Sequence, residues 1–468
     1  MPPDGKPFWG DNPELTQRVA DELDARKDAA PAGYSDDSLA LRFTAKHGAS
    51  LRYVAAWKQW LQFDGRRWQF DNTLAVFDLA RALCRDEAKG VDEEVGESIK
   101  SARTVAAVER LAKSDRQHAA TTEQFDTDPW LLNTPDGTVD LHTGTTRPHA
   151  ASDHLTKITA VSAGGGCPTW LAFLDRVTAG DIELQAFLQR IMGYALTGIT
   201  RDHALFFAHG SGGNGKGVFL NTMTRVLGDY AAVASMETFI ATKTDRHPTD
   251  LAALRGARLV TAQETEEGRL WAEAKIKALT GGDPIAARFM RQDFFTFQPQ
   301  FKLMIAGNHK PSLHAVDEAI RRRFHLLPFT VSIPAAERDT ELPEKLRAEW
   351  GGILAWAIQG CLEWQRIGLQ PPAVVREATE KYLSEEDSFA TWIEECCELE
   401  TSCRETSADL FQSWNGWAEK NGERPWTKKR FSQAMEQRGF EAYRTKDARG
   451  HVGLRLIRTD YSDDPRYR

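Results

Sequence analysis

The sequence lacks any long apolar segment, and this absence argues against a membrane protein. No apolar run comes near the ~20 residues that a membrane-spanning helix needs, and residues Met1–Phe8 lack the apolar core of a secretory signal. Cysteine is also scarce, and the six cysteines form no pair with the spacing of zinc ligands. We therefore expect free thiols and a reducing, cytoplasmic environment, since a chain of this size needs no disulfide framework.

An overall excess of positive charge is missing as well. Lysine and arginine together number 59 against 67 acidic residues, which gives a formal net charge of -8. Contacts with nucleic acid must therefore be confined to local basic patches. The chain shows no internal repeat and no low-complexity tract. Its 468 residues are enough for about three globular domains.

The first part of the chain, residues 35–163, is predicted to be an α+β domain that follows a polar tail at residues 1–34. A helix is expected over Asp37–Gly48. Two aromatic-rich strands flank Asp64-Gly65, a pair that supplies the positive φ angles of a tight hairpin turn. A charged, alanine-rich helical region follows, and the run Gly164–Gly166 marks the domain boundary.

The next part, residues 164–335, alternates between helices and strands. Apolar residues recur with helical spacing between Trp170 and Ile191. Buried strands are expected at Ala204–Ala208, Arg258–Ala262 and Phe301–Ala306, with helices between them. This alternation predicts an α/β core with a parallel sheet and crossover helices. A helical linker, residues 336–405, leads to a last domain at residues 406–468.

A glycine-rich loop follows the first of these strands and opens a helix at Val218. Such a loop lets backbone N–H groups surround a β-phosphate, while its lysine and the helix N-terminus attract the phosphates. A turn without a ligand is the alternative, but it leaves Lys216 at a helix N-terminus, where the helix dipole disfavours a cation. We expect ATP to contact the following residues: Gly210, Ser211, Gly212, Gly213, Asn214, Gly215, Lys216, Gly217 and Val218.

Hydrolysis also needs a carboxylate that polarises the attacking water. Glu264 is the candidate because it ends the apolar strand that begins at Arg258, and it is also the candidate ligand for Mg²⁺. A solvated acidic loop is the alternative, and it suits the neighbouring Glu266 and Glu267 better. Asn308 ends a further strand, at the edge where open α/β sheets bind ligands. It is expected to orient the water or contact the γ-phosphate, with an ordinary turn residue as the alternative.

Three consecutive arginines, Arg321, Arg322 and Arg323, precede another apolar segment. An arginine donated across a subunit boundary can stabilise the charge that develops on the γ-phosphate. Arg322 and Arg323 are the candidates for this role. A basic surface cluster is the alternative.

The order of these motifs resembles that of the superfamily 3 helicases. More closely, the chain is similar to the helicase part of phage and plasmid primase–helicases related to the poxvirus replication ATPase, over roughly residues 35–457. The motifs that carry the resemblance are the glycine-rich loop, Glu264, Leu279-Thr-Gly-Gly-Asp283, Phe297-x-Pro-x-Phe-Lys302, Asn308-His-Lys-Pro311 and Arg322-Arg323-Phe324. The segment that begins Trp130-Leu-Leu-Asn-Thr-Pro-Asp-Gly resembles the domain that precedes the motor in that family.

The resemblance implies an AAA+-like P-loop core, a hexameric ring of identical subunits, hydrolysis of Mg²⁺-ATP, and 3′ to 5′ translocation on single-stranded DNA. It also implies that a hairpin projects into the channel of the ring. Here that hairpin is Arg288–Phe295, with Arg291 as the first candidate for a DNA phosphate contact and Arg288 as the second. For at least two of the phenylalanines nearby, simple packing is the alternative. No primase domain is recognisable, so we expect a separate protein to supply priming.

Two positions depart from the family pattern. Gly217 stands where the strict loop has a serine or threonine whose hydroxyl holds Mg²⁺. Gln263 stands where many P-loop enzymes have a second acid. Metal binding is therefore expected to depend on Glu264, the phosphates and water, and these departures affect the rate of turnover more than nucleotide binding.

The last domain is predicted to be a winged helix-turn-helix, with two helices followed by a glycine-bounded hairpin. Residues 420–458 contain 11 lysines and arginines against 4 acids, the reverse of the balance in the whole chain. Thr427 can cap the second helix, and Lys428, Lys429 and Arg430 lie in its first turn. We expect these three cations to bind DNA phosphates. A winged helix used for protein contact is the alternative.

Together these features predict the motor of a replicative helicase of a phage, prophage or plasmid, acting on single-stranded and forked DNA in the bacterial cytoplasm. An ATP-regulated DNA-binding ring or loader without unwinding activity is the alternative, and the two missing metal-site groups favour it. An ATPase that acts on RNA or protein is a third possibility, which the basic last domain disfavours.

Overall fold

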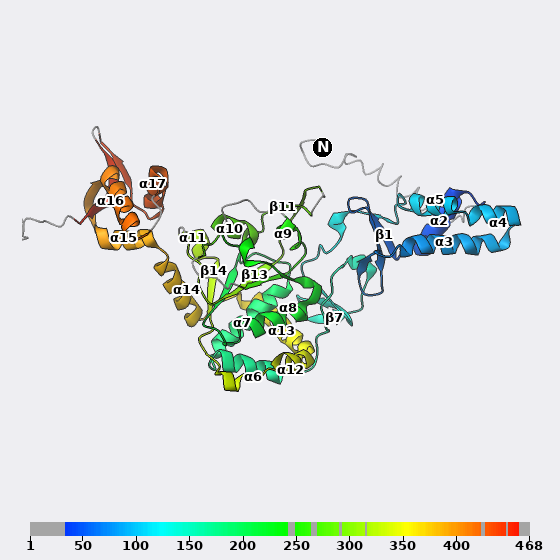
Figure 1. Ribbon diagram of the computed structural model, residues 1–468, viewed down its shortest axis with the longest axis horizontal. Helices are drawn as coiled ribbons and strands as arrows, with labels where there is room; N and C mark the ends of the chain where they lie inside the picture. Colours follow the sequence, from blue (N-terminus) through cyan, green and yellow to red (C-terminus); the bar gives the residue numbers. More distant parts are fainter. Residues whose placement is uncertain are drawn as a thin grey trace, which may run out of the picture. The chain divides into compact units, whose positions relative to one another are not determined.

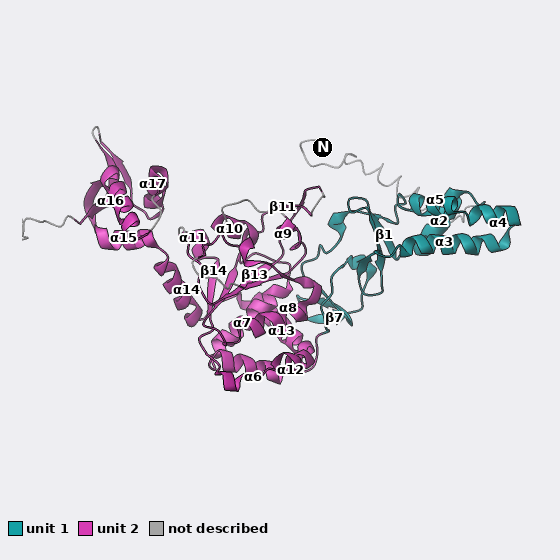
Figure 2. Ribbon diagram, in the orientation of Figure 1, with its two compact units in different colours: residues 1–162 teal, residues 163–468 magenta. Residues whose placement is uncertain are grey.

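The computed structural model describes residues 33–241, 249–263, 269–289, 293–313, 316–422, 426–445 and 448–457. The chain divides into two compact units, Met1–Ser162 and Ala163–Arg468, which Figure 2 distinguishes by colour. Within the described ranges, no helix is long and apolar enough to span a membrane. All six cysteines lie in those ranges and are free thiols, as the sequence predicts.

The first unit contains a group of helices and two small sheets (Figure 1). Its sheets have the strand orders β3-β2-β1-β4 and β5-β6-β7. In chain order its elements are α2 (Asp36–His47), β1 (Leu51–Val54), β2 (Gln59–Phe63), β3 (Trp68–Phe70), α3 (Ala75–Glu87), η1 (Ala88–Gly90), α4 (Glu93–Ile99), α5 (Ala102–Ala112), β4 (Ala119–Ala120), η2 (Thr122–Gln124), β5 (Leu131–Thr134), β6 (Gly137–Asp140), β7 (Thr145–Arg147) and η3 (Ala151–Asp153).

Local signals explain the first elements of this unit. Helix α2 begins after Ser35, whose hydroxyl accepts a hydrogen bond from the N–H of Ser38. Leu39 and Phe43, one helical turn apart, are fully buried in a cluster that α3 and α5 complete. The helix predicted at Asp37–Gly48 is thus confirmed.

The hairpin turn predicted at Asp64-Gly65 is also confirmed. Strands β2 and β3 pair antiparallel across it, and Gly65 has φ 93°. The structure adds a third strand, because β1 folds back antiparallel onto β2 through a turn in which Lys58 has φ 55°. A lysine in the left-handed region is uncommon, so the sequence gives no signal for this reversal.

The second unit is built on a five-stranded sheet with the order β14-β8-β13-β10-β9, in which every pair of neighbours is parallel. The predicted parallel sheet is therefore confirmed. Its elements up to β14 are α6 (Pro168–Val177), α7 (Ile182–Leu196), β8 (Leu205–His209), α8 (Lys216–Leu227), η4 (Gly228–Tyr230), β9 (Ala231–Val233), η5 (Met236–Thr238), α9 (Thr249–Ala252), β10 (Leu259–Gln263), α10 (Glu273–Gly281), β11 (Ile285–Ala287), β12 (Phe295–Phe297), β13 (Lys302–Gly307), α11 (Glu318–Arg321) and β14 (Phe324–Pro328).

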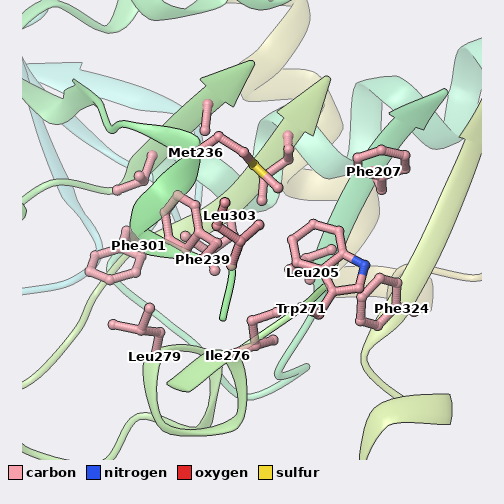
Figure 3. Packing of buried hydrophobic residues seen from close by; sticks show 14 of the residues in the cluster. Leu205, Phe207, Met236, Phe239, Trp271, Ile276, Leu279, Phe301, Leu303 and Phe324 are labelled. Atoms are coloured by element: carbon pink, nitrogen blue, oxygen red, sulfur yellow. The ribbon is translucent and has the colours of Figure 1, made fainter. Parts of the chain in front are cut away.

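Apolar side chains cover both faces of this sheet. Alternate residues of the central strands, such as Leu205 and Phe207 of β8, join one large cluster with Trp271 and Leu303 (Figure 3). On the other face, the Phe206 ring lies 6.4 Å from the Phe187 ring of α7, and α8 packs against β10 and β13. A strand that is buried on both faces consists of consecutive apolar residues. Such strands can therefore be predicted well from the sequence.

The chain after β14 is mostly helical and then forms a second, antiparallel sheet of order β15-β17-β16. Helix α14 packs against β14, and its buried Thr379 accepts a hydrogen bond of 2.9 Å from the N–H of Leu326. The elements are η6 (Ala335–Glu337), α12 (Leu342–Ala348), α13 (Trp350–Ile367), α14 (Ala373–Glu385), α15 (Ser388–Cys396), β15 (Cys397–Thr406), α16 (Ser407–Lys420), α17 (Lys428–Gln437), β16 (Ala442–Arg444) and β17 (Arg449–Leu456).

Helices α7 and α13 cross closely because each has a glycine at the contact. A Cβ added to Gly193 would lie 2.0 Å from the backbone nitrogen of Cys361. A Cβ added to Gly360 would lie 2.1 Å from the carbonyl oxygen of Gln189. Real side-chain atoms do not approach this closely, so the two helices can pack in this way only with glycine at both positions.

Candidate nucleotide-binding site

The glycine-rich loop joins β8 to α8, so the strand–loop–helix context expected from the sequence is present. Gly213 and Gly215 have φ angles of 78° and 85°. These values favour glycine, because a residue with a Cβ atom would be strained there. The side chain of Asn214 is buried and donates a hydrogen bond of 2.9 Å to the carbonyl oxygen of Phe329. This bond fixes the middle of the loop against the chain that leaves β14.

Lys216 is the first residue of α8, and it is 6% exposed. Its Nζ donates to the carbonyl oxygen of Gly210, to Asn214 Oδ1 at 3.1 Å and to Asn308 Oδ1 at 3.3 Å. Burial lowers the pKa of this ammonium group. All these partners are neutral oxygens, and no carboxylate of the described residues forms an ion pair with Lys216. Its positive charge is therefore available to an anion.

Two segments outside the loop hold it in place. On α6, Phe173 and Val177 press against Gly215, where an added Cβ would lie 2.5 Å from Val177 Cγ1. After β14, the carbonyl oxygen of Phe329 would lie 2.0 Å from a Cβ at Gly210. Ile333 also donates a backbone hydrogen bond of 2.9 Å to the carbonyl oxygen of Gly213. The loop sequence gives no sign of either segment.

Asn308 directly follows β13, and β13 pairs with β8 so that Gly307 lies opposite His209. The side chain of Asn308 therefore reaches Lys216 from the neighbouring parallel strand. His209, the residue before the glycine loop, is a further candidate residue of the nucleotide site, and no motif in the sequence marks it. Burial and the nearby charges of Lys310 and Lys216 lower its pKa, so its ring is neutral at neutral pH.

Glu264, the predicted catalytic acid and Mg²⁺ ligand, lies outside the described residues, as do Glu266 and Glu267. Within the described ranges, no group of three acidic, histidine or cysteine side chains could hold a metal. Gln263 ends β10 and places its Nε2 3.4 Å from Asn221 Oδ1 of α8. Mg²⁺ in phosphate sites needs only one or two carboxylates beside the phosphates. The described donors are thus compatible with Mg²⁺ only if Glu264 and the nucleotide supply the charged ligands.

The three arginines have different environments. Arg321 pairs with Glu380 at 2.6 Å. Arg323 is 6% exposed and donates to Thr280 Oγ1 at 3.1 Å and to the carbonyl oxygen of Ala319 at 2.7 Å. Arg322 is exposed and forms no ion pair with any described residue. Of these three arginines, only Arg322 is therefore exposed without an acidic partner among the described residues.

Lys302, the last residue of the motif that begins at Phe297, serves the fold and not the site. Its fully buried Nζ donates to the carbonyl oxygen of Ile199 at 3.0 Å and also to that of Thr197, which caps the C-terminal end of α7. Burial, with the charge of Arg258, lowers its pKa well below the usual value. The motif therefore contains a structural residue.

The hairpin expected in the chain before β13 is present, because β11 and β12 pair antiparallel. The guanidinium of Arg288 lies 4.8 Å from the centre of the Phe294 ring, and Phe294 is 61% exposed. Phe297, in contrast, is buried in the core. Arg291 lies outside the described residues.

The basic turn of the last domain is also present. Thr427 caps α17 and accepts a hydrogen bond from the N–H of Arg430, which confirms the predicted cap. Lys428 and Lys429 are exposed, while the guanidinium of Arg430 lies 4.2 Å from the centre of the Trp426 ring. The helix thus presents at least two cations to solvent.

Comparison with known proteins connects this site to a family. A family model described as D5 N terminal like matches residues 40–179, and a model for a family of unknown function matches residues 208–323. A putative helicase of Frog virus 3 (isolate Goorha) is 26% identical over 274 residues, which cover 54% of this chain and 28% of that protein. A putative helicase of Acanthamoeba polyphaga mimivirus is 23% identical over 270 residues, which cover 53% and 28%.

The chain therefore spans between a quarter and a third of the length of these relatives. Solved structures of the NrS-1 C-terminal region align with a TM-score of 0.47 and 9% identity, over 90% of this chain and 100% of that one. An overlap this loose assigns nothing by itself. Residues 40–179 thus resemble the D5 N terminal like family, and about half of the chain is similar to viral putative helicases.

Proposed function

We propose that this chain is the ATP-driven motor of a DNA helicase. The observation that carries the proposal is the contact between Lys216 at the start of α8 and Asn308 at the end of β13, 3.3 Å apart. It brings a phosphate-binding lysine and a polar sensor together at the carboxyl edge of a parallel sheet, where such folds bind ligands. The helicase names of the viral relatives support the same assignment.

In this proposal the residues of the site divide nucleotide binding and hydrolysis among them. Lys216 and the N–H groups of the loop hold the β- and γ-phosphates of ATP. Glu264 accepts a proton from the attacking water, while Asn308 orients that water or contacts the γ-phosphate. Arg322 of a neighbouring subunit stabilises the developing negative charge, a task for which its outward position makes it a better candidate than the buried Arg323. Bound Mg²⁺ would neutralise phosphate charge, with Glu264 as its protein ligand.

DNA contacts belong to two other regions in this proposal. The β11–β12 hairpin, with Arg288 and Arg291, contacts single-stranded DNA inside a ring, because its mixture of cations and aromatic rings suits backbone tracking and base stacking. The domain at residues 406–468, which we propose to be a winged helix, uses Lys428, Lys429 and Arg430 to hold forked or duplex DNA. We propose a hexameric ring with 3′ to 5′ movement, acting with a separate primase in the replication of a phage, prophage or plasmid.

We further propose the domain limits expected from the sequence: a premotor domain at residues 35–163, an AAA+-like motor at residues 164–335 and a linker at residues 336–405. In the described structure, helix α13 of the linker packs against α7 of the motor. The linker therefore contributes to the motor's packing.

Strand displacement on a forked duplex tests the helicase proposal. The wild-type protein should separate the strands with ATP and fail with a non-hydrolysable analogue. Lys216→Ala should nearly abolish ATP hydrolysis, because the γ-phosphate loses its cation. Glu264→Gln should bind ATP and stall before cleavage. If Glu264→Gln keeps wild-type turnover, the catalytic acid lies elsewhere, and Glu266 and Glu267 are the next candidates.

A second candidate function is an ATP-regulated DNA-binding ring or loader that does not unwind DNA. The observation in its favour is the pair of departures at Gly217 and Gln263, which remove a hydroxyl and a carboxylate from the usual metal site. The same displacement assay separates the two functions. ATP-dependent DNA binding without strand displacement would favour the loader.

A further inference from the structure

Arg338 is a cation that lies against the glycine-rich loop and has no assigned role. It directly follows η6 and packs on Gly213, so that a Cβ added to this glycine would lie 2.2 Å from Arg338 Nη2 and 2.8 Å from its Cζ. The guanidinium therefore covers the backbone of the fourth residue of the loop. The loop motif contains no hint of this contact, because Arg338 lies more than a hundred residues later in the sequence.

The acidic neighbours of Arg338 in the sequence are bound to other cations. Glu337 forms an ion pair with Arg176 of α6. Asp339 pairs with Lys345 at 2.6 Å. Arg338 itself is exposed and forms no ion pair with any described residue. Its charge thus remains uncompensated beside a loop that already contains Lys216 and the positive end of the α8 dipole.

Hydrogen bonds and an ion pair in the neighbouring segment hold the guanidinium of Arg338 in place. Its Nε donates a hydrogen bond of 3.0 Å to the carbonyl oxygen of Ile333. The N–H of Ile333 in turn donates to the carbonyl oxygen of Gly213. The Arg176–Glu337 ion pair ties the same segment to α6, whose Phe173 and Val177 press on Gly215. With Nε occupied, the two terminal nitrogens can still donate to an anion.

We propose that Arg338 is a phosphate-binding residue of the nucleotide site, acting within the same subunit as Lys216. The proposal rests on the proposed function, because it needs the glycine-rich loop to bind a nucleoside di- or triphosphate. The phosphates supply the negative charge that the described residues lack beside Arg338. Guanidinium–phosphate contacts are charge-assisted and are frequently bidentate. They therefore suit a group whose position is already fixed by Ile333.

Calorimetric titration of the full chain with ADP and with inorganic pyrophosphate tests this assignment. Arg338→Gln keeps a side-chain N–H donor for Ile333 and removes the charge, and Arg338→Ala removes both. Both variants should bind ADP and pyrophosphate about tenfold or more weakly than the wild type, because a charge-assisted hydrogen bond is lost. Arg347→Ala is the matched control, since Arg347 is exposed and its partner is Glu344, one turn earlier on α12. It should bind both ligands normally.

Three results would overturn the assignment, and they are distinguishable. If the wild type binds ADP and both Arg338 variants bind it equally well, Arg338 has no contact with the nucleotide although the proposed site stands. If ADP binding weakens but pyrophosphate binding does not, Arg338 contacts the base and not the phosphates. If the wild type binds neither ligand, the nucleotide site itself is wrong and the role of Arg338 fails with it. A normal thermal melt of each variant shows that the fold is intact.

Discussion

The ammonium group of Lys216 lies 3.3 Å from Oδ1 of Asn308, although the two residues are 92 positions apart in the sequence. The contact exists because β8 and β13 are parallel neighbours and both end at the same edge of the sheet. The lysine that we propose to bind phosphates and the amide that we propose to contact the γ-phosphate are therefore in direct contact. A γ-phosphate that binds here would compete with the Asn308 oxygen for the lysine.

Asn308→Ala should separate nucleotide binding from hydrolysis. We expect ATP affinity to stay within about threefold of the wild type, because the loop and Lys216 remain, while the rate of hydrolysis falls by about a hundredfold. The measurements are a binding titration and a steady-state ATPase assay. Asn421→Ala, at the exposed end of α16, is the control and should hydrolyse ATP at the normal rate. A large loss of affinity with unchanged turnover would show that Asn308 only binds.

Replacing Arg322 and replacing Arg323 should have different effects, on activity in mixed rings and on stability respectively. Arg322→Ala subunits mixed with Lys216→Ala subunits should recover part of the ATPase activity, because some interfaces combine an intact Lys216 with an intact Arg322. Arg323→Ala should instead lower the melting temperature, since it removes the buried partner of Thr280 Oγ1 and the Ala319 carbonyl oxygen. No recovery at any ratio, in rings shown to contain both subunits, would count against action across the interface.

Replacing Lys428, Lys429 and Arg430 together by alanine should weaken duplex DNA binding and flatten its dependence on salt. Each neutralised phosphate contributes about 0.9 to the slope, so the change should reach up to about 3. Fluorescence titrations at several salt concentrations measure it, beside an ATPase assay without DNA, which should be unchanged. A triple alanine variant of the exposed Lys89, Lys100 and Lys345 is the control. An unchanged slope would make the last domain a protein-docking module.

Gly193→Ala should destabilise the second unit by about 1–3 kcal/mol, because the added methyl group collides with the backbone of α13. Gly416→Ala is the matched control. Gly416 also lies inside a helix, α16, but an added Cβ there meets no described atom within 4 Å. This change should stabilise the helix by about 0.5–1 kcal/mol. Urea unfolding measures both, and equal effects would refute the close crossing of α7 and α13.

His325 should make the second unit sensitive to acid. Its ring stacks on Phe206 at 5.3 Å, and burial lowers its pKa to about 4, against 6.5 for an exposed histidine. Its stabilising contribution is fully present above pH 6.5 and is lost as the pH falls toward 4, because only the unfolded chain then binds the proton. The loss amounts to about 3 kcal/mol. His325→Phe should unfold with the same urea midpoint as the wild type near neutral pH and a higher one in acid. Identical acid profiles would contradict this.

The sequence predicted the fold best where apolar runs are continuous. The strands at Leu205, Leu259 and Lys302 and their parallel order follow from buried runs that alternate with helices. The reversal at Lys58 was missed because it depends on a left-handed lysine. The linker at residues 336–405 was expected to be helical, but β15 begins at Cys397, since residues from there onward pair with β17.

The site was predictable only where a motif is local. The loop at Gly210–Gly217 and the strand-end Asn308 can be found in the sequence, whereas Arg338 and Ile333 meet the loop only through tertiary packing. The sequence also could not rank Arg322 against Arg323, because their difference is one of burial. The roles of Glu264 and Arg291 stay predictions, since both residues lie outside the described part of the chain.

The position of β8 in the sheet has a consequence for how the protein is made. Strand β8 lies between β13 and β14, which are synthesised about a hundred residues after it. During translation the glycine-rich loop therefore leaves the ribosome with neither neighbouring strand available. Such long-range pairing is slow, and the apolar edges of the strand stay exposed until the pairing is complete. Nascent chains that stop before residue 328 should thus be clients for chaperones, and they should not yet be able to bind a nucleotide.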